Sequence, residues 1–471
     1  MHQGPFCIVP GPFGSRNRDV SRERSPRVTP MGSRMGAYLP LTHISEIKCW
    51  YSGLMSTDPA DAAIPIEPVS YEALDWRPRA PEMHSRAEVM RQTGRYEAAI
   101  PASIPASIAE WSPRIHAEVL ADVEDATRQL VEFDLHAHRI LPGEHPALGP
   151  MAAILLRTEA ASSSQIEQLT TSAKQLALAE IHAGDTANAR AVVGNVHAME
   201  AALALSGTVS VESIREMHRA LMLHQRSCDA ELAGRFREEQ VWIGPGEAGP
   251  RIADFVAPHP DRVPEALADL MTFVRRQDLP VLVQTAVAHA QFETIHPFTD
   301  GNGRTGRALA HSILRNKGLV RSTSVPISAG LLTDVEHYFS ALGEFRDGDA
   351  RAIIREFTRS SRVAAVTGRD LVDALAMQLE GSRAKLAGLR SDAAAWRILP
   401  TLISQPVVTT KHLVARLQLG EMTALRALDA LTERGVIAEM TGKSRARVWQ
   451  HRGILDVLDE YASRIRRMVA R

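Results

Sequence analysis

Apolar residues recur three and four positions apart over most of the chain between about residue 70 and about residue 395. This spacing is typical of amphipathic helices that bury one face. The pattern is clearest in four segments, 115–140, 175–184, 186–205 and 210–224, and the stretch 281–295 also reads as a long helix. We therefore predict a mainly α protein, and the chain shows no fixed-period repeat.

The stretch 234–258 departs from the helical pattern. Two short β-prone runs, at 241–243 and around 252–256, flank a turn rich in Gly and Pro. This arrangement predicts a small β-hairpin. A long helix then ends at His296, because the residue before a proline, here Pro297, avoids the α region.

Residues 407–450 show a third pattern, which reads as helix, turn, helix and two short strands. Leu419 and Gly420 mark the turn, and Gly435 marks the end of the second helix. This order predicts a winged helix-turn-helix domain that is followed by a terminal helix.

These patterns divide the chain into five parts. Residues 1–60 are rich in Gly, Pro, Ser and Arg and poor in apolar side chains, which predicts a disordered segment. A basic arm that contacts nucleic acid is the alternative for this segment, and Met55 is an alternative start. The other parts are a helical N-terminal region at 61–200, a core at 201–370, a connecting helix at 371–395 and the winged helix-turn-helix with its terminal helix at 396–471.

The composition is that of an ordinary globular protein, with 45% hydrophobic and 23% charged residues. A formal net charge of -1 restricts any nucleic-acid contact to a local patch. Cys7, Cys49 and Cys228 lie far apart, which argues against a disulfide scaffold or zinc ribbon and suits the cytoplasm. The chain has no apolar run of about eighteen residues and no secretory signal pattern, so we expect no membrane partner.

The densest chemistry lies in residues 296–307, HPFTDGNGRTGR. Gly301 and Gly303 flank Asn302 and let the backbone approach a ligand closely. A helix begins there, and the backbone N–H groups at a helix N-terminus form an anion site. Arg304 and Arg307 are three apart on that helix and share a face, where two guanidiniums can bind a di- or triphosphate.

Two more side chains of this loop suit phosphate chemistry. Asp300 is a hard oxygen ligand of the kind that Mg²⁺ prefers, and His296 can take a proton near neutral pH. Phe298 is apolar, and we expect it to anchor the loop in the core. Simpler interpretations fit less well, because a dinucleotide fingerprint follows a strand, a calcium loop needs a later acidic ligand, and a helix cap needs only Asp300 or Asn302.

Residues 296–307 fill every fixed position of the motif HPFxDGNGRxxR, so the chain resembles the Fic family over about residues 95–370. The resemblance implies an α-helical core whose motif loop binds ATP as co-substrate with Mg²⁺ as cofactor. It implies a nucleotidyltransferase that moves AMP to a Ser, Thr or Tyr hydroxyl of a target protein.

By this resemblance, each motif residue receives a role. His296 would be the catalytic base and Asp300 the metal ligand. The remaining residues would bind ATP, namely Gly301, Asn302 and Gly303 at the α-phosphate and Arg304 and Arg307 at the outer phosphates.

The hairpin at 234–258 corresponds to the flap of the Fic family, which docks the target segment by strand pairing. Relatives that phosphorylate carry Lys at the position of Gly303, so the glycine favours nucleotidyl transfer.

A separate segment resembles the inhibitory motif [ST]xxxE[GN] of the family. Ser163 and Glu167 lie four apart and therefore on one helical face, while Gln168 stands where Gly or Asn is expected. The resemblance implies autoinhibition, in which Glu167 pairs with Arg307 and blocks the γ-phosphate.

Three alternatives stay open at this point. The same site could hydrolyse AMP from a modified protein with the help of Glu167, or the chain could be a nucleotide-sensing, DNA-binding transcriptional regulator. The winged helix could serve as a protein-binding or homodimer element instead of binding DNA. Candidate DNA contacts are Thr423, Arg426 and Glu433 in the second helix, and Lys443, Arg445, Arg447, Arg464, Arg466, Arg467 and Arg471 after it.

Overall fold

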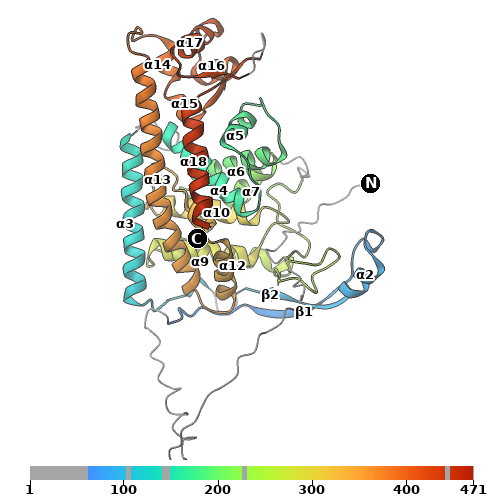
Figure 1. The fold of residues 1–471 in the computed structure, drawn as a ribbon. Coiled ribbons are helices and arrows are strands. Elements are labelled where there is room, and N and C mark those ends of the chain that lie inside the picture. The colour runs from blue at the N-terminus through green and yellow to red at the C-terminus, as the bar shows by residue number, and fades with distance from the viewer. Residues whose placement is uncertain (1–61, 102–107, 141–148, 225–230, 441–445, 470–471) are drawn as a thin grey trace, which may run out of the picture.

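The computed structural model describes residues 62–101, 108–140, 149–224, 231–440 and 446–469. The protein is mainly α-helical, as the sequence predicts (Figure 1). The predicted disordered segment at 1–60 lies outside the described residues. No helix in the described ranges combines the length and the apolar character that crossing a bilayer requires.

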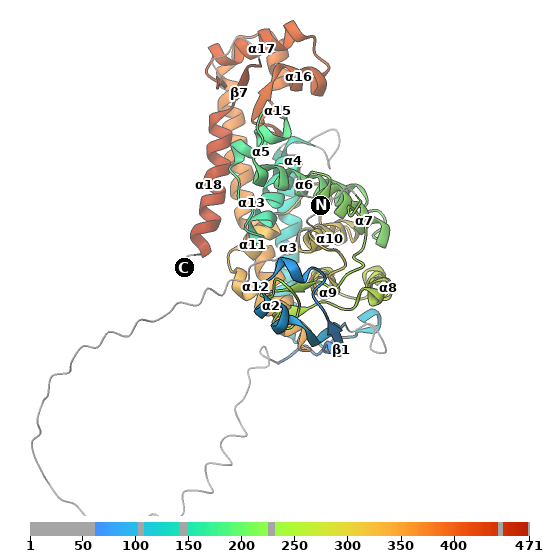
Figure 2. The ribbon, with the colours of Figure 1, turned by 90° about the vertical axis from the view of Figure 1, so that its right-hand side faces the viewer.

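Helix α9 (Val281–Ile295) forms the centre of the core. All of its residues except the first are buried, so its polar side chains, such as Gln284, His289 and Glu293, lie inside the core together with its apolar ones. Helices α8 (Val263–Arg275), α10 (Asn302–Asn316) and α13 (Arg351–Lys385) pack around it. The long α13 also runs beside α3 (Ala117–Ile140) and α18 (Arg452–Val469) (Figures 1 and 2).

Six more helices complete the core: α4 (Pro150–Ile166), α5 (Ala173–Glu180), α6 (Ala187–Ala204), α7 (Val211–Met222), α11 (Ile327–Leu332) and α12 (Val335–Arg346). Short 3₁₀ turns lie at Ile108–Glu110 and Pro260–Arg262. Ser172, Thr186 and Ser210 cap α5, α6 and α7 by accepting hydrogen bonds from backbone N–H groups of the first turn. Helices α6 and α13 run unbroken across residues 200 and 370, where the sequence analysis places domain boundaries.

Residues 70–100 correct the sequence analysis, which treats the chain as helical from about residue 70. Strand β1 (Ser70–Trp76) pairs antiparallel with β2 (Gly94–Ile100) over seven residues each. A 3₁₀ turn (Pro81–Met83) and α2 (Arg86–Gln92) lie between the two strands. Exposed and partly buried residues alternate along most of β1, and in β2 the buried Tyr96 and Ala98 alternate with exposed neighbours. This period of two in burial is typical of a half-buried strand.

The hairpin predicted at 234–258 is confirmed. Strand β3 (Trp242–Ile243) pairs antiparallel with β4 (Phe255–Val256). The β1–β2 arm, which extends from the body in Figure 1, is bound to this hairpin. The Trp76 ring meets the Trp242 ring edge-on at 5.4 Å between centroids, and Arg251 donates to three backbone carbonyls between residues 91 and 95.

The C-terminal part begins with α14 (Ala394–Ile398) and α15 (Thr401–Ser404). Three short strands form one antiparallel sheet in the order β5 (Val407–Thr409), β7 (Val448–Gln450), β6 (Ala438–Glu439). Helices α16 (Thr410–Leu417) and α17 (Glu421–Glu433) lie between β5 and β6 in the chain. The two helices and the last two strands follow the predicted order, whereas β5 lies where the sequence analysis places the start of the first helix. The assignment as a winged helix-turn-helix stays a prediction.

Asp134 gives a test of how α3 is held to the core. Its buried carboxylate accepts hydrogen bonds from the backbone N–H groups of residues 321–323. Asp134→Ala should leave buried donors unsatisfied and lower the free energy of unfolding, measured by chemical denaturation, by about 3 kcal/mol. Asp122→Ala, which removes an exposed ion pair with Arg362, should cost less than about 1 kcal/mol. Equal losses would contradict this account.

Candidate active site

The predicted motif loop lies between the C-terminus of α9 and the N-terminus of α10. His296 follows the last turn of α9 with φ +50°, and Gly301 precedes α10 with φ +77°. Both residues are left-handed, so the chain reverses within a few residues. Gly301 is required there, because a Cβ atom would also lie 2.8 Å from the Leu221 side chain.

Asn302 and Phe298 close the loop on itself. The Phe298 N–H donates to Asn302 Oδ1, and Asn302 Nδ2 donates to the Phe298 carbonyl, both at 2.8 Å. Both residues are buried, so the prediction that Phe298 anchors the loop is confirmed. Both polar atoms of the Asn302 side chain are thus used to hold the shape of the loop. Only the backbone N–H of Asn302 is left to bind a ligand.

His218 on α7 is a site residue that the sequence analysis missed. Its ring stacks on the Phe298 ring at 3.7 Å between centroids. Nδ1 accepts a hydrogen bond from the Gly234 N–H, so Nε2 carries the proton and donates to the Asp300 carbonyl at 3.0 Å. Burial lowers the pKa of His218 to about 4, which keeps this neutral tautomer. The only signal in the sequence was a polar residue on the apolar face of a predicted helix.

Arg304 is the residue whose surroundings point most clearly to an anion. Its side chain is 5% exposed, yet Nε and Nη1 have no hydrogen-bond partner among the described residues. Its Nη2 lies 3.5 Å from Asp300 Oδ1. Unsatisfied buried donors of a charged group cost free energy, and a phosphate beside the first turn of α10 would satisfy them.

Asp300 fits the role of a Mg²⁺ ligand. Its side chain is 34% exposed, and Oδ1 accepts a hydrogen bond from the Gly301 N–H at 2.6 Å. The described residues contain no group of three or more His, Cys, Asp or Glu side chains suited to a metal. A single carboxylate agrees with Mg²⁺ chemistry in which substrate phosphates and water complete the coordination.

Arg307 brings the predicted inhibitory residues to the loop. Its Nε donates to Ser163 Oγ at 2.8 Å, and its Nη2 donates to the Ser163 carbonyl at 2.9 Å and to Glu167 Oε1 at 2.7 Å. A Cβ atom on Gly303 would lie 2.2 Å from Glu167 Oε1. The Glu167 carboxylate therefore occupies space against the first turn of α10, where the sequence predicts phosphate.

Gln168 explains why Gly or Asn is expected after the glutamate. It has φ +62°, and the N–H groups of residues 168 and 169 donate to the carbonyls of Gln165 and Ser164. This pair of hydrogen bonds is the Schellman ending of a helix, which favours glycine at the left-handed position. Here Gln168 adopts that conformation at a steric cost.

A second, buried contact holds α4 beside α10. Glu159 on α4 accepts from the Ser328 backbone N–H at 2.9 Å and from the Ser328 hydroxyl, and its Oε1 lies 2.8 Å from His311 Nε2 on α10. These interactions fix the helix that carries Ser163 and Glu167.

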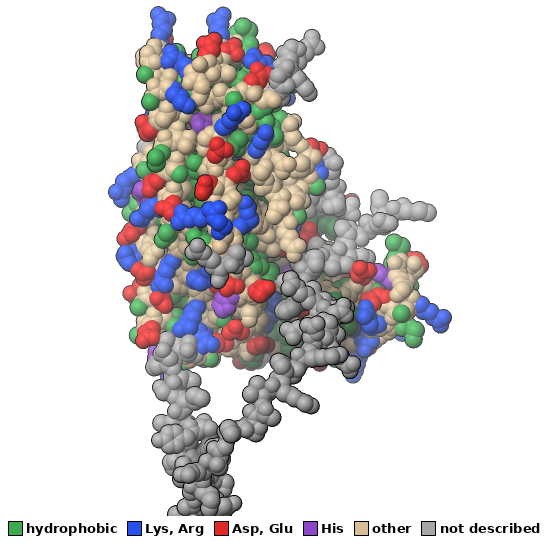
Figure 3. Space-filling model, in the orientation of Figure 1, with side chains coloured by type: hydrophobic (Ala, Val, Ile, Leu, Met, Phe, Trp, Pro, Cys, Tyr) green, Lys and Arg blue, Asp and Glu red, His purple; other side chains and the backbone are tan. Residues whose placement is uncertain are grey.

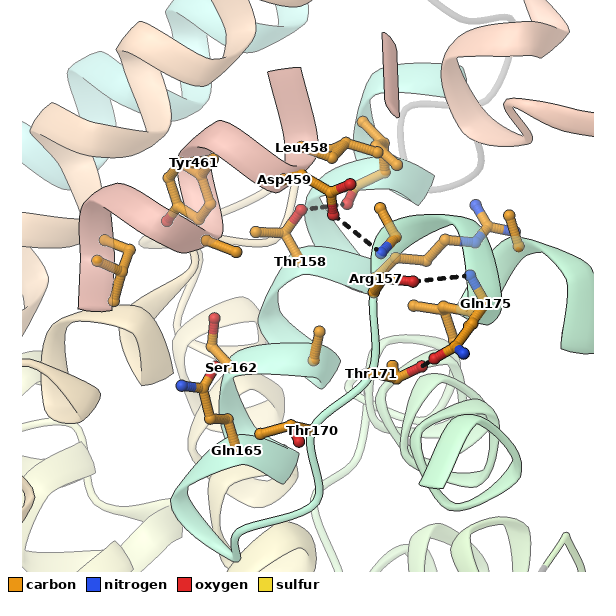
Figure 4. A pocket seen from close by; sticks show the side chains of 18 of the residues that line it. Arg157, Thr158, Ser162, Gln165, Thr170, Thr171, Gln175, Leu458, Asp459 and Tyr461 are labelled. Carbon is orange, nitrogen blue, oxygen red and sulfur yellow. Dashed lines mark hydrogen bonds between the residues drawn. The ribbon is translucent and has the colours of Figure 1, made fainter. Parts of the chain in front are cut away.

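On its other flank, α4 borders a cavity of about 450 Å³ that α5 and α18 complete (Figure 4). Thr158, Ser162 and Gln165 of α4 line it together with Asp459 and Tyr461 of α18. No residue of the motif loop 296–307 contributes to this lining. The cavity is therefore separate from the candidate active site.

His296 has the tautomer that a base requires. Its Nδ1 lies 3.3 Å from the Glu293 carbonyl oxygen, an acceptor only, so the proton resides on Nδ1 and Nε2 keeps its lone pair. Burial and the nearby Arg237 guanidinium lower the pKa of His296 to about 3. The imidazole is thus neutral at physiological pH, although 17% of the side chain reaches solvent.

Glu293, one turn before His296, is a second residue that the sequence analysis missed. Its side chain is buried, and Oε1 has no hydrogen-bond partner among the described residues. Burial raises the pKa of Glu293 to about 7, and the Arg307 guanidinium opposes part of this shift. The position falls within the apolar run of α9, which concealed it in the sequence.

Two of the candidate DNA contacts pair with carboxylates of the protein itself. Arg447 pairs with Glu439 and Asp429, and Arg464 pairs with Asp370. Lys443, Arg445 and Arg471 lie outside the described residues. On the face in Figure 3, Lys and Arg side chains are interspersed with Asp and Glu. These features give DNA binding no support beyond the order of the elements.

Comparisons with known proteins find similarity in the same region. Residues 208–314 match the model of the Fic/DOC family. The chain is 30% identical over 159 residues to the protein adenylyltransferase fic-1 of Caenorhabditis briggsae, covering 33% of this chain and 28% of the relative. It is 32% identical over 112 residues to a probable protein adenylyltransferase of Aquifex aeolicus, covering 24% and 32%. The aligned part thus spans about a third or less of these relatives.

Among solved structures, a Fic family protein from Desulfovibrio desulfuricans is similar with a TM-score of 0.46 and 22% identity. The similarity covers 72% of this chain and 97% of that chain.

The left-handed Gln168 leads to a stability prediction. Gln168→Gly should remove the steric cost of positive φ and raise the free energy of unfolding by about 1 kcal/mol. Gln165→Gly, at a helical position in the last turn of α4, should lower it by about 1 kcal/mol. Thermal and chemical denaturation measure both variants. A lower free energy of unfolding for Gln168→Gly than for the parent would contradict the inference that Gln168 is strained.

Glu293 leads to a pH prediction. Between its usual pKa of 4.5 and about 7, the folded protein holds a proton that the unfolded chain has released, so stability decreases as pH rises through this window. Glu293→Gln should remove this contribution, which is at most about 1.4 kcal/mol per pH unit. The variant should then be more stable than the parent at pH 8. Denaturation at several pH values tests this, with the exposed Glu212→Gln as the control that leaves the profile unchanged.

Proposed function

This chain is a Fic family protein whose Fic domain spans residues 208–314, and from this premise we propose that it is a protein adenylyltransferase. It transfers AMP from ATP to the hydroxyl of a Ser, Thr or Tyr side chain in a target protein. The observation that carries the proposal is that two donors of the buried Arg304 have no hydrogen-bond partner in the described part of the chain. Arg304 lies at the start of α10, across the loop from a neutral His296.

The reaction follows from these positions. His296 Nε2 accepts the hydroxyl proton while the hydroxyl oxygen attacks the α-phosphorus. The bond from the α-phosphorus to the bridging oxygen breaks, and pyrophosphate leaves with its electron pair. Arg304 and Arg307 stabilise the negative charge that develops on the leaving group. Mg²⁺ held by Asp300 would neutralise further charge when bound.

We further propose that Glu167 inhibits this activity. Its carboxylate pairs with Arg307 and lies against Gly303, so it competes with an incoming phosphate for the same guanidinium and the same space. Two anions cannot both occupy this position at low cost, because like charges at short range repel strongly. The reverse reaction, removal of AMP with Glu167 in a catalytic role, is the alternative that uses the same site.

Substitution of the two key residues tests the function. With α-labelled ATP, Mg²⁺ and cell lysate, Glu167→Gly should increase labelling of the enzyme itself or of target proteins at least about tenfold, as expected for loss of about 1.4 kcal/mol of competition. His296→Ala in that background should decrease labelling at least about a hundredfold, because a general base contributes on that scale. His197→Ala, at a partly exposed position outside the motif loop, is the control for the loss of an imidazole.

Two outcomes would contradict the proposals. Equal labelling with and without His296 would exclude the transferase, and equal labelling with and without Glu167 would exclude the inhibition. Release of AMP from a pre-modified protein by the parent chain, lost in Glu167→Gly, would instead assign the hydrolase.

A further inference from the structure

Arg237 is a buried arginine with an uncommon set of partners. It precedes β3 at the start of the flap hairpin (residues 234–258) and is 4% exposed. Its side chain has no carboxylate within ion-pair distance among the residues that the structure describes, and every hydrogen bond it donates goes to a backbone carbonyl. A buried charge without a countercharge is costly, so the carbonyls that surround it must supply the compensation.

Some of these carbonyls belong to the end of α9. Arg237 Nε donates to the His296 carbonyl at 2.8 Å, and Nη2 approaches the Ile295 carbonyl at 3.5 Å. The last carbonyls of a helix lack partners within the helix and carry its negative dipole end. The guanidinium therefore satisfies them and is itself stabilised by them.

The other carbonyls belong to the two ends of the flap hairpin. Arg237 Nη1 donates to the Glu239 carbonyl at 3.0 Å, and Nη2 donates to the Pro258 carbonyl at 2.6 Å. The Arg237 backbone N–H also donates to the Pro297 carbonyl at 3.0 Å. One residue thus joins both ends of the hairpin to the two residues at which α9 stops.

His296 depends on such a restraint. It is a non-glycine residue at φ +50°, and this left-handed conformation persists only where surrounding interactions hold it. The hydrogen bond from Arg237 to the His296 carbonyl restrains the peptide group that follows this strained position. The longer contact with the Ile295 carbonyl restrains the peptide group that precedes it. A change in them would rotate the imidazole away from its place beside the loop.

We propose that Arg237 is a positioning residue that couples the flap hairpin to His296. It fixes the position of the hairpin, which is expected to dock the target, relative to the base that is expected to deprotonate the target hydroxyl. This inference rests on the proposed adenylyltransferase function. The positive charges of Arg237 and Arg346 also favour the neutral form of His296, whereas the negative charge of Asp300 opposes it. The Glu293 carboxylate lies 4.0 Å from Nδ1 of the imidazole.

The coupling is testable without activity. In the protein that retains Glu167, Arg237→Met should increase the rate of amide hydrogen exchange by tenfold or more, both in the flap hairpin and at the end of α9. Arg276→Met removes hydrogen bonds to two other backbone carbonyls, those of Ala109 and Trp111, and should change neither segment. Unchanged exchange in Arg237→Met, or an increase in only one segment, would overturn the proposal even if the enzyme proved to have another activity.

Kinetics in the Glu167→Gly background then separate positioning from general loss of structure. Arg237→Met should lower kcat for self-adenylylation about a hundredfold, with the Kd for MgATP changed less than twofold. Arg237→Lys keeps the charge but cannot reach carbonyls on both segments, so it should recover only part of kcat. A parallel loss of kcat and nucleotide binding, or full rescue by lysine, would overturn the positioning role. If Glu167→Gly itself shows no labelling, the result counts against the proposed function. Hydrogen exchange would still show whether Arg237 couples the flap hairpin to the end of α9.

Discussion

The rest of the site depends on the reversal of the chain between α9 and α10. Left-handed residues at both ends of the loop, His296 and Gly301, let the C-terminus of one helix and the N-terminus of the next meet within a few residues. The carbonyls that end α9 are negative, and the amides that begin α10 are positive. One short loop thus joins a cation-binding end beside the histidine to an anion-binding end beside Arg304. The backbone alone therefore places a negative helix end beside the histidine and a positive helix end beside the expected phosphate site. The charged side chains add to this separation of charge.

The stability of this reversal comes from partners that lie far away in sequence. His218 on α7 stacks on Phe298 and donates to the Asp300 carbonyl, and Arg237 binds the carbonyl of His296. Asn302 closes the loop from within. Each of these side chains satisfies backbone groups that a tight turn would otherwise leave unpaired and buried. The loop is thus held by side chains on the side of the base, whereas two donors of Arg304, on the side expected to receive phosphate, have no partner among the residues that the structure describes.

The sequence predicted those parts of the molecule whose conformation is determined locally. Pro297, Gly301 and the apolar period of α9 were enough to place the loop between two helices, because each residue restricts its own backbone. Contacts such as Arg237 with residues 295–297 were not predictable, since they join segments whose approach is set by the packing of the whole core. The β1–β2 arm was missed for a related reason: apolar and polar side chains alternate only imperfectly along its strands. Their buried face is defined by contact with the hairpin at 242–256 rather than by their own composition.

The arrangement of α4 indicates how the proposed inhibition could be relieved. Glu159, Ser163 and Glu167 recur every four residues and so lie on one face of α4, where they contact His311 and Arg307 on α10. The Glu159 contact is buried, and breaking it would leave an uncompensated polar group at a cost of several kcal/mol. Glu167, in contrast, lies beyond the last helical turn and is 21% exposed. If Glu167 alone turned away, Ser163 would still hold the Arg307 guanidinium in place, and a phosphate would replace the carboxylate as its charged partner. The structure therefore favours exchange of one anion for another at a fixed arginine over displacement of the helix.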